Sequence, residues 1–150
     1  MLHKFRGNST DGAIPSASLI FDGAGNLYGT TSGLPGTVFK LTRGTNGWTE
    51  KVLDYFTADS KGFGPYGGVV FDGAGNLYGT TYYGGGHAVG DVFELTKSAG
   101  WAERVLHHFT TDGDGRNPSG TLIFDTSGNL YGTTDYGGAA AGGTVFEVTP

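Results

Sequence analysis

The chain contains three copies of one eleven-residue segment, and this repeat constrains its fold more than any other feature. FDGAGNLYGTT begins at Phe21 and again at Phe71, and FDTSGNLYGTT begins at Phe124. The copies start at residues 21, 71 and 124, so 50 and then 53 residues separate them. A period of this length is typical of a supersecondary unit that buries its apolar face only against a neighbouring copy.

Similarity outside the segment divides the whole chain into three units. Each unit has an aligned Leu-x-x-Phe before the segment and an aligned Val-Phe after it, and Trp48-Thr49-Glu50 matches Trp101-Ala102-Glu103. We therefore expect one repeat domain over residues 1–150, with repeats at 1–51, 52–104 and 105–150. The first unit begins with residues that, in the second and third units, come shortly after a Trp-x-Glu. The boundary between units therefore falls inside an element of secondary structure.

Composition excludes several classes of protein. Glycine supplies 30 of 150 residues without a period of three, so the glycines mark turns, and an aromatic content of 13% is too high for a disordered chain. The formal charge of -5 predicts no nucleic-acid partner. No apolar run approaches the ~20 residues of a membrane span, so we expect no membrane insertion. There is no cysteine, and therefore no disulfide.

Short apolar runs between Gly, Asn, Asp and Pro clusters predict strands, and no stretch has a helical period. In the second unit we expect a tight hairpin at 72–76 and four antiparallel strands, over 68–71, 76–81, 91–96 and 101–109. Gly79 lies within the second of these strands, as Gly29 and Gly132 do in the other units. A glycine there indicates a close approach, for which crowding near the axis of a radial array is one explanation.

The fold class predicted by this pattern is all-β, with β-propeller blades of four antiparallel strands and three repeats per chain. Propellers contain about 4–8 blades, so three are too few to close a ring, whereas two chains supply six. We therefore expect a homodimer. The segment Met1–Phe5 then acts as an outer strand for a blade that begins elsewhere, in the same chain or in a partner. A β-trefoil monomer and an excerpt of a longer repeat array are the alternatives.

The repeated motifs also carry a family resemblance. GNLYGTT, followed by a Gly-Gly loop and then by GTVF or DVF, resembles the GloVer-type tandem repeats of bacteria. The resemblance spans the whole chain, and the Asp-x-x-Gly-Asn turn is distantly similar to that of six-bladed propellers. Proteins of this type tend to be secreted or surface-anchored arrays without assigned chemistry. The resemblance therefore implies an extracellular or cell-surface location and brings no catalytic residue.

The loops after the repeated segment vary most between the units, and they are the predicted contact surface. Tyrosines close to Asp suit sugar or peptide recognition, because they combine a flat apolar face with hydrogen bonding. The alternative is that the aligned Tyr83 and Tyr136 are structural, and that the two tryptophans serve packing between units. The candidate ligand-binding residues are Tyr82, Tyr83, His87, Asp135 and Tyr136.

Carboxylates suggest two kinds of metal site, and we expect neither to be occupied. Asp22, Asp72 and Asp125 each precede a turn that ends in Asn, which favours a hydrogen-bonded turn over a cation site. Asp112 and Asp114 are the better calcium candidates, because they are spaced by glycine, but no Glu follows at the spacing of a hand-type loop. We therefore expect no cofactor, and calcium at Asp112 and Asp114 is the alternative.

No catalytic motif is present, so the chain is predicted to be no enzyme. GxSxG and HExxH are absent, and the glutamates recur at framework positions. The expected function is a self-assembling scaffold or ligand-display module, with a glycan or a protein as partner. A lectin-like carbohydrate-binding β-protein is the alternative, and a hydrolase with its site at a propeller axis is the outside alternative.

Overall fold

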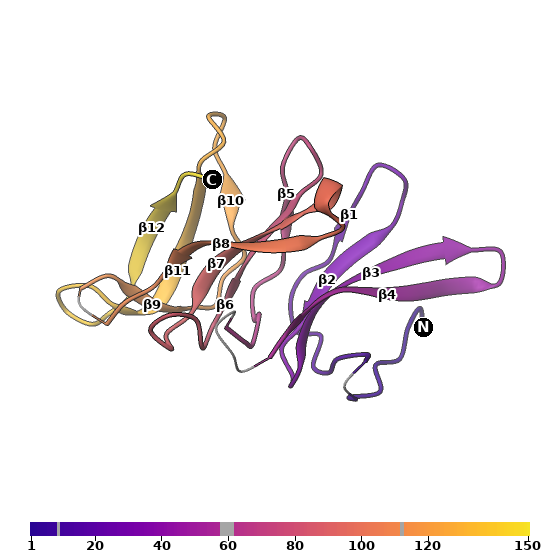
Figure 1. The fold of residues 1–150 in the computed structure, drawn as a ribbon, viewed down its shortest axis with the longest axis horizontal. Coiled ribbons are helices and arrows are strands. Elements are labelled where there is room, and N and C mark those ends of the chain that lie inside the picture. The colour runs from indigo at the N-terminus through magenta and orange to yellow at the C-terminus, as the bar shows by residue number, and fades with distance from the viewer. Residues whose placement is uncertain (9, 58–61, 112) are drawn as a thin grey trace.

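The computed structural model describes residues 1–8, 10–57, 62–111 and 113–150, and nearly all of its regular structure is β-strand (Figure 1). This confirms the all-β prediction. Within these ranges the single helix is the 3-10 turn η1 (Lys97–Ala99). With three residues, this helix is too short to span a membrane.

Two of the three units form the predicted four-stranded antiparallel sheets, with neighbouring strands in chain order. The first sheet contains β1 (Ile20–Phe21), β2 (Leu27–Thr31), β3 (Gly36–Gly44) and β4 (Gly47–Phe56). The second sheet contains β5 (Val70–Phe71), β6 (Leu77–Thr81), β7 (Asp91–Thr96) and β8 (Ala102–His108). In this second unit the predicted strand at 91–96 is confirmed at both ends, and the other three strands are shorter than predicted.

The third sheet reaches four strands in a different way. Its strands are β9 (Gly115–Pro118), β10 (Ile123–Phe124), β11 (Leu130–Gly137) and β12 (Thr144–Val148). Here β9 pairs with the second half of β11, opposite Thr134 and Tyr136. Among the described residues no strand pairs with the outer edge of β12. In the other two sheets the equivalent strands, β3 and β7, pair on that edge with β4 and β8.

Each sheet has two apolar faces of different composition. The face here called the tyrosine face carries a Tyr and a Val: Tyr28 and Val38, Tyr78 and Val92, and Tyr131 and Val145. The leucine face carries a Leu and a Phe: Leu27 and Phe39, Leu77 and Phe93, and Leu130 and Phe146. The two sets separate because successive side chains of a strand point to opposite faces.

The core lies between sheets, where the tyrosine face of one unit packs on the leucine face of the next. Tyr28 and Val38 lie in one buried cluster with Leu77 and Phe93. Tyr78 and Val92 lie in a second cluster with Leu122 and Leu130, and Phe146 packs at its margin. Figure 1 shows the three sheets in a row, with the N-terminus and β12 at opposite ends.

The row is open at both ends in the single chain. No closed barrel or ring forms among the described residues, and no strand of one sheet pairs with a strand of another. The structure therefore gives no support to the β-trefoil, which requires a barrel shared by its three repeats.

The recurring mid-strand glycines are explained by a close approach of an aromatic ring. A Cβ atom added to Gly79 would lie 2.7 Å from Cζ of Phe93 and 3.3 Å from Cγ1 of Val69. Gly29 and Gly132 have the same relation to the phenyl rings of Phe39 and Phe146. A close approach therefore does occur, but its cause is the facing phenylalanine of the neighbouring strand in the same sheet, and not the expected crowding near the axis of a radial array.

Candidate functional site

The three Asp-x-x-Gly-Asn turns are held by the same set of hydrogen bonds. Asp72 Oδ1 accepts from the backbone N–H of Ala74 at 2.9 Å and of Asn76 at 2.8 Å. Its Oδ2 accepts from Asn76 Nδ2 at 2.8 Å and from the Tyr78 hydroxyl at 3.1 Å. Asp22 and Asp125 repeat all four bonds. The predicted hydrogen-bonded turn is confirmed, and these carboxylates already accept four donors each.

The electrostatics of these turns follow from the same bonds. Although burial opposes it, hydrogen bonding from Asn26 and Tyr28 lowers the pKa of Asp22 to about 2. Burial and the Asp22 carboxylate together raise the pKa of Tyr28 to about 12. The charge of Asp22 therefore stabilises the turn and keeps the tyrosine in its hydroxyl form.

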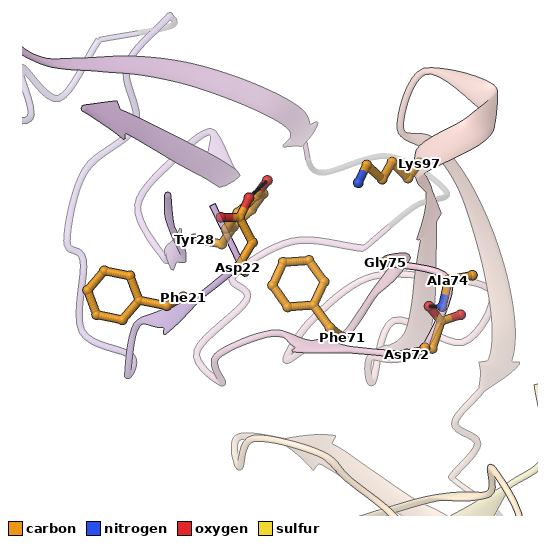
Figure 2. Close-up of a pocket in the computed structure, with 10 residues that line it drawn as sticks. Phe21, Asp22, Tyr28, Phe71, Asp72, Ala74, Gly75 and Lys97 are labelled. Carbon is orange, nitrogen blue, oxygen red and sulfur yellow. Dashed lines mark hydrogen bonds between the residues drawn. The ribbon is translucent and has the colours of Figure 1, made fainter. Parts of the chain in front are cut away.

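A cleft of about 360 Å³ lies between the first and second turns, and Figure 2 shows the side chains that line it. The Phe71 ring lies beside Asp22, and the Lys97 amine points from the second unit into the cleft. An equivalent cleft of about 420 Å³ lies between the second and third turns, and Phe124 and Pro150 are among its lining residues. Each cleft is lined by the turns of two successive sheets, so the clefts recur with the repeat.

The structure brings part of the predicted contact surface together. Tyr82 lies in the loop after β6, whereas Asp135 and Tyr136, which were expected in a loop, lie in the second half of strand β11, where Tyr136 is opposite Arg116 of β9. Burial raises the pKa of Tyr82 to about 12, with a further contribution from the neighbouring Asp135 carboxylate and from Tyr136. Asp135 accepts a hydrogen bond from Ser119 at 2.6 Å, and the guanidinium of Arg116 lies 5.8 Å from the centre of the Tyr136 ring. Hydroxyl, carboxylate and guanidinium groups therefore surround exposed aromatic rings at the seam of the second and third units.

A cluster of aromatic rings continues this surface within the second unit. The rings of Tyr82 and Tyr83 lie 4.6 Å apart, and Tyr83 stacks on Phe63 at 5.1 Å. The Tyr66 ring lies 5.1 Å from that of Tyr82 and is partly exposed. Tyr83 is thus both structural, through its backbone bridge to Phe63, and partly exposed to solvent.

The remaining predicted residue, His87, is exposed. Three contributors were not predicted from the sequence: Tyr66, Arg116 and Ser119. A signal for two of them existed, because Tyr66 and Ser119 directly follow the aligned prolines Pro65 and Pro118.

Of the two calcium candidates, Asp114 belongs to the described part of the chain. Asp112 lies outside the described residues. Asp114 Oδ2 lies 2.9 Å from Nε2 of His107, and Asp114 Oδ1 accepts from the N–H of Gly115 at 2.8 Å. Asp114 therefore has two local partners, and calcium binding stays a prediction that no contact in this loop addresses.

A group of titratable residues that the sequence analysis did not single out lies beside the N-terminal segment. His3 Nε2 lies 2.7 Å from Asp11 Oδ1 and 3.7 Å from Glu50 Oε2. One ligand atom from each of the three lies within 4.8 Å of the others, so these residues have the donor types of a metal site. Burial and the neighbouring Asp11 carboxylate raise the pKa of Glu50 to about 7, so a proton can take the place of a cation there.

The sequence of the chain matches one described family. The family model of the Gloeobacter/Verrucomicrobia repeat matches residues 33–150. No curated protein matches the chain. The matched range includes the second and third copies of the repeated segment and both Tyr82 and Tyr136.

Proposed function

Because the chain belongs to the Gloeobacter/Verrucomicrobia repeat family, we propose that it is a non-enzymatic β-repeat module that assembles with a second copy and displays its long loops to a ligand. The observation that carries this proposal is the difference between paired and open sheet faces. Val38 and Val92 are fully buried, whereas the equivalent Val145 of the third sheet is 80% exposed.

The opposite end of the row has the complementary surface. Val69 and Leu122 are buried on the leucine faces of the second and third sheets, whereas the equivalent Leu19 of the first sheet is 49% exposed. Burying an exposed Val or Leu side chain contributes about 1.5–3 kcal/mol. The tyrosine face of the third sheet therefore remains open in one chain. The leucine face of the first sheet is open around Leu19, while Phe5 and Trp48 cover its buried cluster of Leu27, Phe39 and Leu41. Each open surface is of the kind that covers the other inside the chain.

A second copy can cover both open faces at once. The tyrosine face of each third sheet then packs on the leucine face of the other chain's first sheet. Two such contacts close a ring of six sheets, within the roughly 4–8 blades of known propellers. Closure matters because an unclosed head-to-tail contact would continue into a filament.

The ring leaves the loop after β6 and the second half of β11 available for binding. Tyr82, Asp135 and Tyr136 combine ring faces with charged and hydrogen-bonding groups, a composition that suits a saccharide or a peptide. An extracellular or cell-surface location fits such a role and stays a prediction.

The substitution Val145→Glu tests the assembly directly. Because Val145 is exposed in the single chain, a glutamate there leaves the fold intact but places a charge in the proposed contact. We expect light scattering to give twice the 15.5 kDa chain mass for the unmodified protein and the single mass for the variant. Ala140→Glu, in an exposed loop, is the matched control. A variant that keeps the doubled mass would contradict the proposed contact.

A further inference from the structure

The outer edge of β12 is an unpaired strand edge in the part of the chain that the structure describes. In the first and second sheets the equivalent strands, β3 and β7, pair on that side with β4 and β8. An unpaired edge presents a row of free N–H and C=O groups, which favours pairing with a strand from another chain.

The N-terminal segment has the sequence and the position of the missing strand's end. Residues 2–5 align with 53–56 at the end of β4 and with 106–109 around the end of β8. The Phe5 ring lies 5.0 Å from Phe39, as Phe56 lies 4.8 Å from Phe93 and Phe109 lies 4.9 Å from Phe146. Residues 2–5 therefore contact the first sheet as the ends of β4 and β8 contact the second and third.

What differs is the strand that pairs with this segment. Residues 53–56 pair with β3, whereas residues 2–5 lie outside the strands of the described chain. The N-terminus and β12 lie at opposite ends of the row, so they do not meet within one chain (Figure 1). We propose, on the basis of the proposed function, that residues 2–5 of a second copy form the fourth strand on β12, and that the exchange is reciprocal.

The two complete sheets specify the register of this strand. In the second sheet Asp91 is opposite His108, and the N–H of Phe109 donates to the carbonyl of Gly90 at 3.1 Å. In the first sheet Thr37 is opposite Tyr55 and Gly36 is opposite Phe56. Carried over to the third sheet, Lys4 of one copy is opposite Thr144 of the other, and the N–H of Phe5 donates to the carbonyl of Gly143.

Side chains of the Lys4–Thr144 pair lie on the same face of the sheet. In the equivalent pair of the second sheet, Nδ1 of His108 lies 2.6 Å from Oδ1 of Asp91. Facing Cα atoms of antiparallel strands are about 4.5–5.5 Å apart, which is within the range that a disulfide spans. Two cysteines at these positions would therefore be able to bond without movement of the backbone.

The absence of cysteine from the natural chain makes this geometry testable. The double variant Lys4→Cys/Thr144→Cys is oxidised, and the disulfide is located by peptide mass spectrometry. We expect a covalent dimer in which residues 4 and 144 of different chains are joined. The matched control is Lys4→Cys/Val145→Cys, because residue 145 points to the opposite face of β12, and we expect at least a tenfold lower yield of crosslink.

The mass of the unmodified protein separates the possible results. A doubled mass with the 4–144 disulfide supports the strand exchange. A doubled mass without that disulfide, or with equal crosslinking at 144 and 145, overturns the exchange and leaves the face-to-face assembly standing. A single mass for the unmodified protein overturns both the exchange and the proposed function.

Discussion

At the scale of single residues, the repeated positions are explained by contacts that recur in every unit. Asp22, Asp72 and Asp125 hold the turns by accepting hydrogen bonds from backbone N–H groups two and four residues later. This role was predictable, because all of these groups lie within one short stretch of sequence. The ring that excludes a side chain at Gly79 was not predictable, because Phe93 is fourteen residues away and the register of two strands decides their contact.

Replacing Gly79 by alanine tests this contact. The added methyl group would lie 2.7 Å from the Phe93 ring in a fully buried layer, so the sheet must shift. We expect a loss of about 1–3 kcal/mol in the free energy of unfolding, measured by chemical denaturation. Gly73→Ala is the control, since nothing lies within 4 Å of its added Cβ, and we expect little change there. Equal effects of the two substitutions would contradict the packing explanation.

Glu50 makes stability depend on pH in a defined direction. Its pKa is raised from 4.5 to about 7, so between these values the folded chain keeps a proton that the unfolded chain has released. The free energy of unfolding therefore falls as the pH rises through this window. We compare the free energy of unfolding of Glu50→Gln with that of the natural chain at each pH. The difference should shift in favour of the variant by on the order of 1–3 kcal/mol between pH 5 and pH 8. Parallel pH profiles for the two proteins would disprove this effect.

At the scale of elements, the sequence predicted the strands that have clear boundaries. The strand at 91–96 was predicted at both ends, because Gly90 precedes it and a turn follows it. The register shift between Val92 and Phe93 was not predicted, and the same shift occurs between Val38 and Phe39. A bulge depends on how two strands pair, so the composition of one strand does not reveal it.

The predicted contact surface was a pair of variable loops, whereas in the structure Asp135 and Tyr136 lie at the end of strand β11. Tyr82, Asp135 and Tyr136 are brought together across the second and third units, a contact between residues more than fifty positions apart that the sequence alone does not reveal. If this surface binds saccharides, Tyr136→Ala should weaken binding at least tenfold on a glycan panel, since the Tyr136 ring is half exposed. Ser32→Ala, in the shorter loop of the first unit, should have no effect. Unchanged binding by Tyr136→Ala would assign the ligand to another surface.

At the scale of the whole molecule, each sheet has an apolar surface on both faces. A sheet at the end of the row therefore has one face that no neighbouring sheet of the same chain covers. Trp101 packs at the contact of the first two sheets, where its ring lies 6.1 Å from that of Tyr28. Its counterpart Trp48 packs on the leucine face of the first sheet, at the open end of the row. The repeat predicted three sheets that need neighbours, but the arrangement of faces became visible only once the strands were paired.

The most direct test of the account is the mass of the unmodified chain in dilute solution, measured by light scattering over a series of concentrations. We predict a stable particle of twice 15.5 kDa, because the tyrosine and leucine faces at the two ends of one chain cover those of the other. A folded particle of 15.5 kDa at every concentration would contradict the account.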